Sequence, residues 1–324
     1  MPRHSLNSVL QAVLREHVDE VVVHSILKED DHRFWEENGY LVIPNVVPEP
    51  LRNGVVGAIW DHLGVEGDQP QDWHRVSPGG GDESAALITR GGGVRISSHH
   101  QALWDTRQYA PIHQIFTEIL GTEKLWVSFD RVNMKPPVHP DHPEWESDGL
   151  SVHWDLNVEK LTAVPLTVQG ILYLTDTDED QGGFRCVPGF HRRFDRWRQT
   201  LPPGGNAGRP PFEKVDLAPI PGKAGDFLVW HRLTPHANGR NESDRPRMAQ
   251  YITMFSAPES NERLRQERIA SWRDDTPIRS TKSQEFDIPG DDLPEPTHSW
   301  DTHRNHPPEL TTLGRRLAGL DLWP

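Results

Sequence analysis

Two histidines and one aspartate have the types and spacing expected of ligands to one divalent metal ion. His153 and Asp155 lie in the run SVHWDL, which has the character of a β-strand. Side chains alternate across a strand, so the two are expected to project to the same face, one pleat apart. A third ligand must come from elsewhere. His236 is the best candidate, because it follows the strand-like run 227–230 in the expected loop 234–238.

This set of ligands favours redox chemistry at iron over a structural metal site. Two imidazoles and one carboxylate on one face of an octahedron leave three positions open, which iron(II) needs in order to hold a bidentate 2-oxo acid and O₂. A closed site with four protein ligands would suit structural zinc instead. His153, Asp155 and His236 are therefore predicted to be both the metal ligands and the catalytic residues.

A basic residue at a suitable offset from His236 identifies the 2-oxo acid. Arg247 follows that histidine by eleven positions and begins another strand-like run. If the chain turns back and re-enters the sheet, the guanidinium of Arg247 would face inward and clamp the distal carboxylate of 2-oxoglutarate with two hydrogen bonds. Arg245 is the near alternative, but Pro246 separates the two, so only Arg247 begins the strand cleanly. The sequence thus predicts Fe(II), 2-oxoglutarate and O₂ at one site.

A second H-x-D sequence, His139-Pro140-Asp141, competes with the first for the role of ligand pair. Prolines surround it, and because proline cannot donate to a sheet ladder, this sequence is expected in a loop. His153 and Asp155 are therefore preferred.

Several other residues with reactive or polar side chains are expected to carry no chemistry. His191 is interpreted as a turn residue bonded to backbone, and His99 and His100 as a solvated surface pair. Trp154 should point away from the metal and pack in the core, and Cys186 should be buried and inert.

Five sequence blocks occur in an order that is typical of one enzyme family. They resemble the phytanoyl-CoA dioxygenase family of iron(II)/2-oxoglutarate oxygenases over residues 34–256. Two departures concern the substrate pocket, namely Phe190 in place of a small residue before His191, and a long tail beyond 257. The blocks are NGYLVIPNVV at 38–47, MKPP at 134–137, QGGFRCVPGFH at 181–191, GDFLVWH at 225–231 continuing to His236, and the run 241–247.

This resemblance implies a double-stranded β-helix with flanking N-terminal helices. It implies iron ligation by His153, Asp155 and His236, and clamping of the co-substrate by Arg247. It also implies further co-substrate contacts. The strand before the H-x-D would contribute Arg131 or Asn133, and an earlier basic position would contribute Arg95. Asn238 lies just past the distal histidine, and Gln169 or Ile171 lies on a strand that often lines the site.

Short strands are expected to hold these residues. Without long helices between them, they indicate an antiparallel sandwich or barrel. Helices are expected before them, at 5–28, from Asp30 to a break at Asn38-Gly39, from Pro48 to Leu63 and at 108–120, and after them at 261–269 and 308–320. The expected strands are 40–43, 125–134, 151–157, 167–174, 184–187, 225–231 and 247–255.

The predicted fold class is therefore mainly β with flanking helices. Its core is a jelly-roll or cupin-like double-stranded β-helix at about 125–256. An N-terminal helical part at 1–124 and a C-terminal helical or irregular extension at 257–324 complete a single domain, 1–324.

Length, charge and cysteine usage narrow the function classes. A chain of 324 residues suits one large domain, and a single cysteine fits a reducing compartment. The net charge of −14 disfavours nucleic acid, because an acidic surface repels phosphate backbones. No run approaches the roughly 20 apolar residues of a membrane span, and we expect no signal peptide, because the N-terminal residues contain no uninterrupted apolar run. We expect a cytoplasmic enzyme with a small-molecule substrate, no nucleic acid and no membrane. The oligomeric state is not predicted.

The expected reaction is hydroxylation of an unactivated C–H bond in a small metabolite or natural-product intermediate, with release of succinate and CO₂. Desaturation and epoxidation stay open, whereas related halogenases replace the carboxylate that Asp155 supplies. A CoA thioester is disfavoured, because the sequence has no concentrated Lys/Arg patch for its polyphosphate. The alternative is a non-redox metal-dependent isomerase or hydrolase on a cupin-like barrel, which would not need Arg247. A family member that only binds a ligand is a third possibility.

Overall fold

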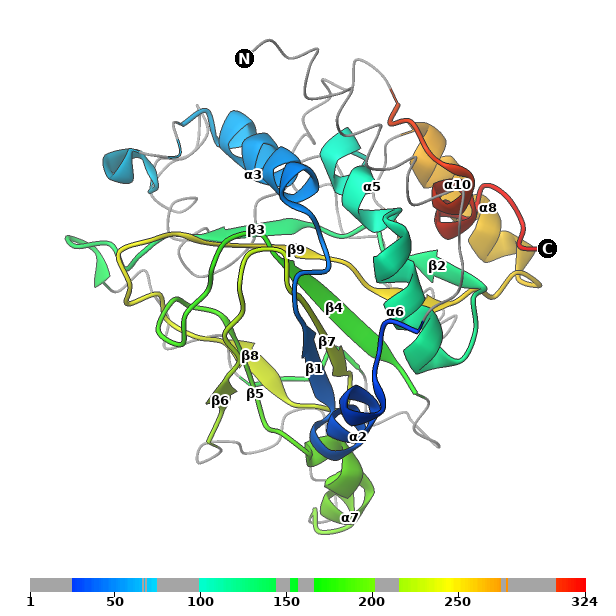
Figure 1. Cartoon of the computed structure of the whole chain (residues 1–324), viewed down its shortest axis with the longest axis horizontal. Coiled ribbons are helices and arrows are strands. Elements are labelled where there is room, and N and C mark those ends of the chain that lie inside the picture. Colours follow the sequence, from blue (N-terminus) through cyan, green and yellow to red (C-terminus); the bar gives the residue numbers. More distant parts are fainter. Residues whose placement is uncertain are drawn as a thin grey trace.

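The computed structural model describes residues 25–65, 67, 69–74, 99–143, 152–156, 166–201, 216–274, 278 and 307–324. Within these ranges antiparallel sheets form the core, and helices lie over and beside it (Figure 1). The predicted mainly β class with flanking helices is confirmed at this level. The helix expected over 5–28 falls almost entirely outside the described residues. No described helix is both long and apolar enough to cross a lipid bilayer.

The largest sheet has five strands, and every neighbouring pair in it is antiparallel. Four of its strands lie within runs that were predicted as strands. Their order across the sheet is β1 (Tyr40–Ile43), β7 (Phe227–His231), β4 (Val168–Tyr173), β9 (Arg247–Tyr251) and β3 (Val132–Lys135).

The two faces of this sheet belong to different apolar clusters, as the alternation of side chains requires. Leu172 on β4 and Phe227 and Val229 on β7 join the main core beneath the helices. Ile171 and Leu228 face the other way, into a second apolar cluster that also contains Phe184 and Cys186 of a separate three-stranded sheet. Polar residues of the candidate site lie on this second face.

Two smaller sheets complete the β structure. One pairs β6 (Ala218–Pro219), β5 (Phe184–Cys186) and β8 (His236–Asn238), and the other pairs β2 (Leu125–Val127) with β10 (Met254–Ser256). The predicted strands 125–134 and 247–255 are therefore wrong as single elements. Each is two short strands, because regular pairing between the two runs is interrupted after Ser128. The runs still pair with each other on both sides of the break, β2 with β10 and β3 with β9, and the register shifts by one residue between the two pairs. The backbone N–H of Ser128 donates to the Thr253 carbonyl at 2.8 Å.

The N-terminal helices cover the outer face of the large sheet. The helices predicted to end at Asn38 and Leu63, and the one predicted at 108–120, are confirmed, and each stops at a glycine in the left-handed region. One short helix was not predicted. The four are α2 (Glu29–Asn38), α3 (Glu49–Leu63), α5 (Gln101–Arg107) and α6 (Ala110–Leu120).

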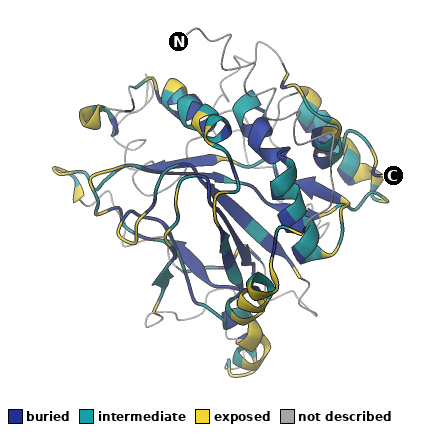
Figure 2. Ribbon diagram, viewed as in Figure 1, coloured by how far each residue is buried: buried dark blue, intermediate teal, exposed yellow. Residues whose placement is uncertain are grey.

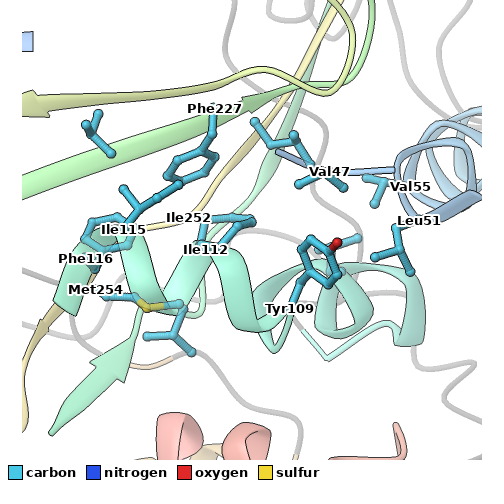
Figure 3. Packing of buried hydrophobic residues seen from close by; sticks show 14 of the residues in the cluster. Val47, Leu51, Val55, Tyr109, Ile112, Ile115, Phe116, Phe227, Ile252 and Met254 are labelled. Carbon is cyan, nitrogen blue, oxygen red and sulfur yellow. The ribbon is translucent and has the colours of Figure 1, made fainter. Parts of the chain in front are cut away.

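Helix α6 illustrates how these helices are held. Ile112, Ile115 and Phe116 recur at three- and four-residue spacing and are fully buried. Figure 3 shows this apolar stripe directed at Phe227 of β7, and the rings of Phe116 and Phe227 lie 5.9 Å apart. Exposed residues concentrate at the outer surfaces of the peripheral helices, while the strands are largely buried (Figure 2).

The C-terminal extension packs on the sheet formed by β2 and β10. It contains α8 (Glu262–Asp274), which is longer than predicted, and α10 (Thr312–Ala318), which is shorter. Arg268 of α8 is fully buried, and its guanidinium lies over the rings of Trp126 and Phe129 at 5.0 and 4.3 Å. It also donates to the carbonyls of Val127 and Ala318. This one side chain therefore joins α8, α10 and β2.

Candidate metal centre

His153, Asp155 and His236 converge, with one ligand atom from each within 4.8 Å of the others. Asp155 lies between the two imidazoles, because its Oδ1 is 3.5 Å from Nε2 of His153 and its Oδ2 is 3.4 Å from Nε2 of His236. Neighbouring ligands at about 2.1 Å from an ion lie about 3 Å apart, so small movements would let all three share one ion. In the described part of the chain this is the only such group of three.

The elements that carry these ligands differ from the prediction. The expected strand 151–157 is wrong, because His153 makes only an isolated antiparallel bridge with His236. The expected loop 234–238 is also wrong, since His236 begins strand β8. Reciprocal backbone hydrogen bonds of 3.1 Å between His153 and His236 form the bridge. The ligands are thus brought together by pairing across the fold rather than by the pleat of one strand.

Trp154 anchors the segment between the two ligands that flank it. Its ring is buried and packs against Phe190 of η3 (Phe190–Arg193) and against Phe194 and Trp197 of α7 (Phe194–Arg198). Its Nε1 donates to the carbonyl of Leu233 at 2.8 Å. The prediction that Trp154 points away from the metal and packs in the core is confirmed.

The hydrogen bonds of His236 leave its second nitrogen available as a ligand. Nδ1 lies 3.0 Å from the carbonyl of Thr234, which can only accept, so Nδ1 carries a proton and Nε2 is the nitrogen that faces Asp155 and would bind an ion. The ring is buried against Phe184 and Trp230, at centroid distances of 5.4 and 5.3 Å. The orientation of this ligand is therefore fixed by the protein.

Asp155 is held in the charged form that a metal ligand needs. Partial burial would raise the pKa of its carboxyl. The hydrogen bonds and charges of His153 and His236 outweigh that effect, and they hold the pKa well below its usual range. Gln169 on β4 donates from Nε2 to Oδ2 of Asp155 at 2.8 Å.

Arg247 lies deeper in the same face of the large sheet. It is only 1% exposed, at the first position of β9, and its Nη1 donates to Oδ1 of Asn133 at 2.7 Å. Its Nε and Nη2 are buried and have no hydrogen-bond partner among the described residues. Arg245, the alternative, is half-exposed and pairs with Asp178. Of the two arginines, only Arg247 turns inward, as the sequence predicted.

The other predicted co-substrate residues fall at different distances from Arg247. Asn133 touches it directly. Arg131 precedes β3, two positions before Asn133, and its guanidinium lies 4.7 Å from the Tyr251 ring centroid. Asp130 first, and Asp155 to a lesser degree, raise its pKa. Asn238 is two positions past His236 on β8, half-buried. Arg95 lies outside the described residues.

Lys135 was quoted in the sequence only as part of a motif, yet it lies beside Arg247. The two are partners across the β3–β9 pair, and Lys135 is 2% exposed, with Nζ 2.5 Å from the carbonyl of Gly239. Strand alternation places Lys135 and Asn133 on one face, so the signal was present in the sequence once the register was known. A second buried cation therefore lies next to the inward arginine.

The residues expected to be inert give a mixed outcome. His191 lies in η3 and not in a turn, but its imidazole contacts backbone as expected, with Nε2 3.1 Å from the carbonyl of Glu36. Cys186 is confirmed as buried, and burial raises the pKa of its thiol to about 12. The solvated pair is wrong for His99, which is 2% exposed and packs on Trp104. His100 is exposed, as expected, and its Nδ1 accepts from the backbone N–H of Ala102 at the start of α5.

Comparisons with known proteins show which family and which fold the chain resembles. The model of the phytanoyl-CoA dioxygenase (PhyH) family matches residues 35–249. A protein of Dictyostelium discoideum named "Putative phytanoyl-CoA dioxygenase" is 25% identical over 264 residues, which cover 69% of this chain and 74% of that one. The 2-aminoethylphosphonate dioxygenase of the uncultured bacterium HF130_AEPn_1 is 21% identical, over 74% of this chain and 86% of its own.

A solved structure extends the likeness in fold to nearly the whole chain. The product of GlcNAc Inducible Gene 2 from Candida albicans superimposes with a TM-score of 0.60 at 14% identity, covering 99% of this chain and 84% of that one. At this identity the likeness concerns the fold alone.

Proposed function

The chain belongs to the phytanoyl-CoA dioxygenase family, and from that premise we propose that it hydroxylates an unactivated C–H bond of a small metabolite or natural-product intermediate. The family and the donor set make it an iron(II)- and 2-oxoglutarate-dependent dioxygenase that consumes O₂. The observation that carries the proposal is an open three-ligand site on the same face as a buried guanidinium with unpaired donors.

His153, Asp155 and His236 are the proposed iron ligands, and the donor set fits that ion. Two imidazoles and one carboxylate match the ligand type of non-haem iron oxygenases, and they occupy only half of an octahedron. When bound, iron with 2-oxoglutarate and O₂ supplies the oxidising chemistry, with succinate and CO₂ as products. The protein holds the ligands ready: Thr234 orients His236, and the imidazoles keep Asp155 ionised.

Arg247 is the proposed clamp for the distal carboxylate of 2-oxoglutarate. Because Asn133 occupies Nη1, the free donors are Nε and Nη2, which lie on one edge of the guanidinium. That edge matches the two oxygens of a carboxylate. A buried cation with unpaired donors is costly without an anion, which supports a binding role. Lys135 beside it adds to the attraction for a dianion.

The remaining co-substrate contacts are proposed from their positions near the metal ligands or Arg247. Asn133 aims Arg247, and Arg131 lies nearer Asp155, where it would favour the carboxylate at the metal end. Asn238 shares its side of β8 with His236. Gln169 lines the metal end through its bond to Asp155. Arg95, predicted from the resemblance, completes the set.

The finer description of the fold belongs to the same proposal. We propose that the large sheet and the sheet of β5, β6 and β8 face one another as a double-stranded β-helix, with the site between them. The shared apolar cluster that contains Ile171, Phe184 and Trp230 supports this arrangement. Residues 1–324 are proposed to act as a single domain.

The names of the relatives point to different substrates. One relative, matched over 86% of its length, is named for 2-aminoethylphosphonate, and another, matched over 74%, is named for phytanoyl-CoA. The substrate class is therefore open, so a panel of carboxylates, amino acids and terpenoid or polyketide scaffolds is the appropriate screen.

The test is formation of succinate from 2-oxoglutarate by the Fe(II)-loaded protein under air, measured with and without the substrate panel. The wild-type protein should release succinate, and Asp155→Ala should not, because the carboxylate ligand is lost. A non-redox isomerase or hydrolase would bind metal but leave 2-oxoglutarate intact. Intact 2-oxoglutarate in the presence of every panel member, with metal bound, would contradict the proposal.

A further inference from the structure

Gln169 is the residue of β4 that reaches the candidate metal centre. Along β4 the side chains alternate, so Gln169 shares its face with Ile171 and Tyr173 and lies opposite Trp230 of β7. Ile171, Tyr173 and Trp230 are apolar or aromatic and almost fully buried. A primary amide in this position therefore interrupts an otherwise apolar row next to the metal ligands.

The hydrogen bond of this amide fixes its orientation. A carboxylate that binds a metal can only accept, so the atom 2.8 Å from Oδ2 of Asp155 must be the donor Nε2. The carbonyl Oε1 is then directed away from Asp155. It is buried, and no described residue gives it a hydrogen bond. An unpaired buried acceptor destabilises a protein, so the amide is kept here for its N–H donor and not for its packing.

The two imidazoles do not choose between the oxygens of Asp155. Oδ1 is 3.5 Å from His153 and Oδ2 is 3.4 Å from His236, an almost symmetrical arrangement. A symmetrical carboxylate can bind an ion through both oxygens, since carboxylate ligands bind in either mode. Bidentate binding would leave only two of six positions, too few for a chelating 2-oxo acid and O₂. The hydrogen bond from Gln169 breaks the symmetry, because it engages Oδ2 alone.

We propose that Gln169 is a positioning residue that restrains Oδ2 of Asp155, so that the carboxylate binds the ion through Oδ1 only. This inference rests on the proposed function, because it concerns the same metal centre. It gives Gln169 a role through Asp155, in addition to the co-substrate contact proposed above. The consequence is a third open position, which the reaction requires.

Metal affinity tests the proposal without relying on turnover. Co(II) is titrated into the apo protein, followed by its visible absorption, and 2-oxoglutarate is then titrated into the Co(II)-loaded protein. Gln169→Leu removes the donor at nearly constant volume. Gln169→Asn keeps an amide but withdraws it by one methylene. Gln250→Leu is the matched control, since Gln250 is a fully buried glutamine of the same sheet that bonds to Thr106 on the opposite face.

Both Gln169 variants should bind Co(II) about 10- to 100-fold more weakly, the loss typical of hydrogen-bond partners of metal ligands. Both should also bind 2-oxoglutarate more weakly once loaded. Gln250→Leu should lose thermal stability but keep the wild-type Co(II) affinity. If Gln169→Leu fails to fold, the Asn variant gives the same comparison. Wild-type affinities for Co(II) and 2-oxoglutarate in a folded Gln169 variant would overturn the proposal.

The proposed function fails in a different way. A wild-type protein that binds Co(II) and shows the Gln169 effect, yet leaves 2-oxoglutarate unconsumed with Fe(II), supports the positioning role and contradicts the dioxygenase reaction. A wild-type protein that binds Co(II) no better than His236→Ala overturns both.

Discussion

The guanidinium of Arg247 donates from Nη1 to the amide oxygen of Asn133 at 2.7 Å, across the β3–β9 pair. The bond uses one nitrogen of three and leaves Nε and Nη2 buried and unpaired among the described residues. Asn133 is itself fully buried, so it cannot turn away to solvent. The result is an arginine whose free edge is held in one direction before any ligand arrives.

Arg247→Lys should raise the KM for 2-oxoglutarate about 30- to 100-fold while the protein remains folded. Lysine keeps the charge but loses the edge with two parallel donors, and a hydrogen bond to a charged group contributes about 2 to 3 kcal/mol. The measurement is succinate release against 2-oxoglutarate concentration. Arg245→Lys is the control and should behave as wild type, since Arg245 is half-exposed and pairs with Asp178. Equal KM values for the two variants would contradict the clamp.

Asn133→Asp should weaken 2-oxoglutarate binding more than Asn133→Leu does. The leucine only frees Arg247 from its partner, whereas the aspartate places a carboxylate where it competes with the co-substrate for the same guanidinium. Neither change touches a metal ligand, so Co(II) affinity should stay at the wild-type value in both. Isothermal titration of 2-oxoglutarate into the Co(II)-loaded variants measures the order. A reversed order would show that Arg247 does not meet the co-substrate carboxylate.

His236→Ala should lower the affinity for Co(II) by more than about 100-fold, which is the upper limit usual for losing a mere hydrogen-bond partner of a ligand. The second H-x-D sequence provides the control. His139 lies outside the group of three, and its Nδ1 accepts backbone hydrogen bonds from Asp141 and His142. His139→Ala should therefore bind Co(II) as the wild type does. A larger loss of Co(II) affinity in His139→Ala than in His236→Ala would contradict the assignment of His236 as a ligand and would favour the second H-x-D sequence.

The parts of the site that the sequence could predict depend on local pattern. The H-x-D pair, the distal histidine and Arg247 each belong to a short recognisable run, and strand alternation gives the facing of Arg247 once β9 exists. The second H-x-D sequence was assigned to a loop from its surrounding prolines alone. Residue type and spacing were sufficient there, because each argument concerns a stretch of roughly a dozen neighbouring residues or fewer.

The parts that could not be predicted depend on pairing between distant segments. His153 is placed by its bridge to His236, and no periodicity in the run SVHWDL reveals that partner. His99 is buried because Trp104, Phe129 and Trp272 enclose it, and these come from α5, the link between β2 and β3, and α8. The Gln169–Asp155 bond likewise joins two segments. The break after Ser128 likewise depends on the partner run, because the register between the two paired runs shifts by one residue there.

Arg268→Met should lower the free energy of unfolding by about 3 kcal/mol or more. Methionine fills similar space among the aromatic rings, but the carbonyls of Val127 and Ala318 lose their charged donor inside the core. Urea unfolding measures the change. Arg263→Met on the exposed side of α8 loses an i,i+4 pair with Glu267 at the surface and should cost about 0.5 kcal/mol or less. Similar values for both would mean that Arg268 does not hold the extension.

His231 should make the protein less stable as the pH falls from about 6.5 to about 4. Burial first, and the neighbouring His191 second, lower the pKa of His231 to about 4. The unfolded chain, with a histidine pKa near 6.5, therefore binds more protons than the folded protein in this window. Stability is complete above the window and is lost on acidification, by about 3 kcal/mol for this group at most.

Asp105 acts in the opposite direction over a similar range, so variants are needed to separate the two groups. Burial raises the pKa of Asp105 to about 6. The folded protein therefore binds more protons than the unfolded chain between pH 3.8 and about 6, and this group adds stability on acidification. In urea unfolding at pH 7, 5.5 and 4.5, His231→Asn should lose less stability than wild type as the pH falls, because asparagine can still accept the N–H of Leu233 without titrating. Asp105→Asn should lose more. Parallel curves for the three proteins would contradict both assignments.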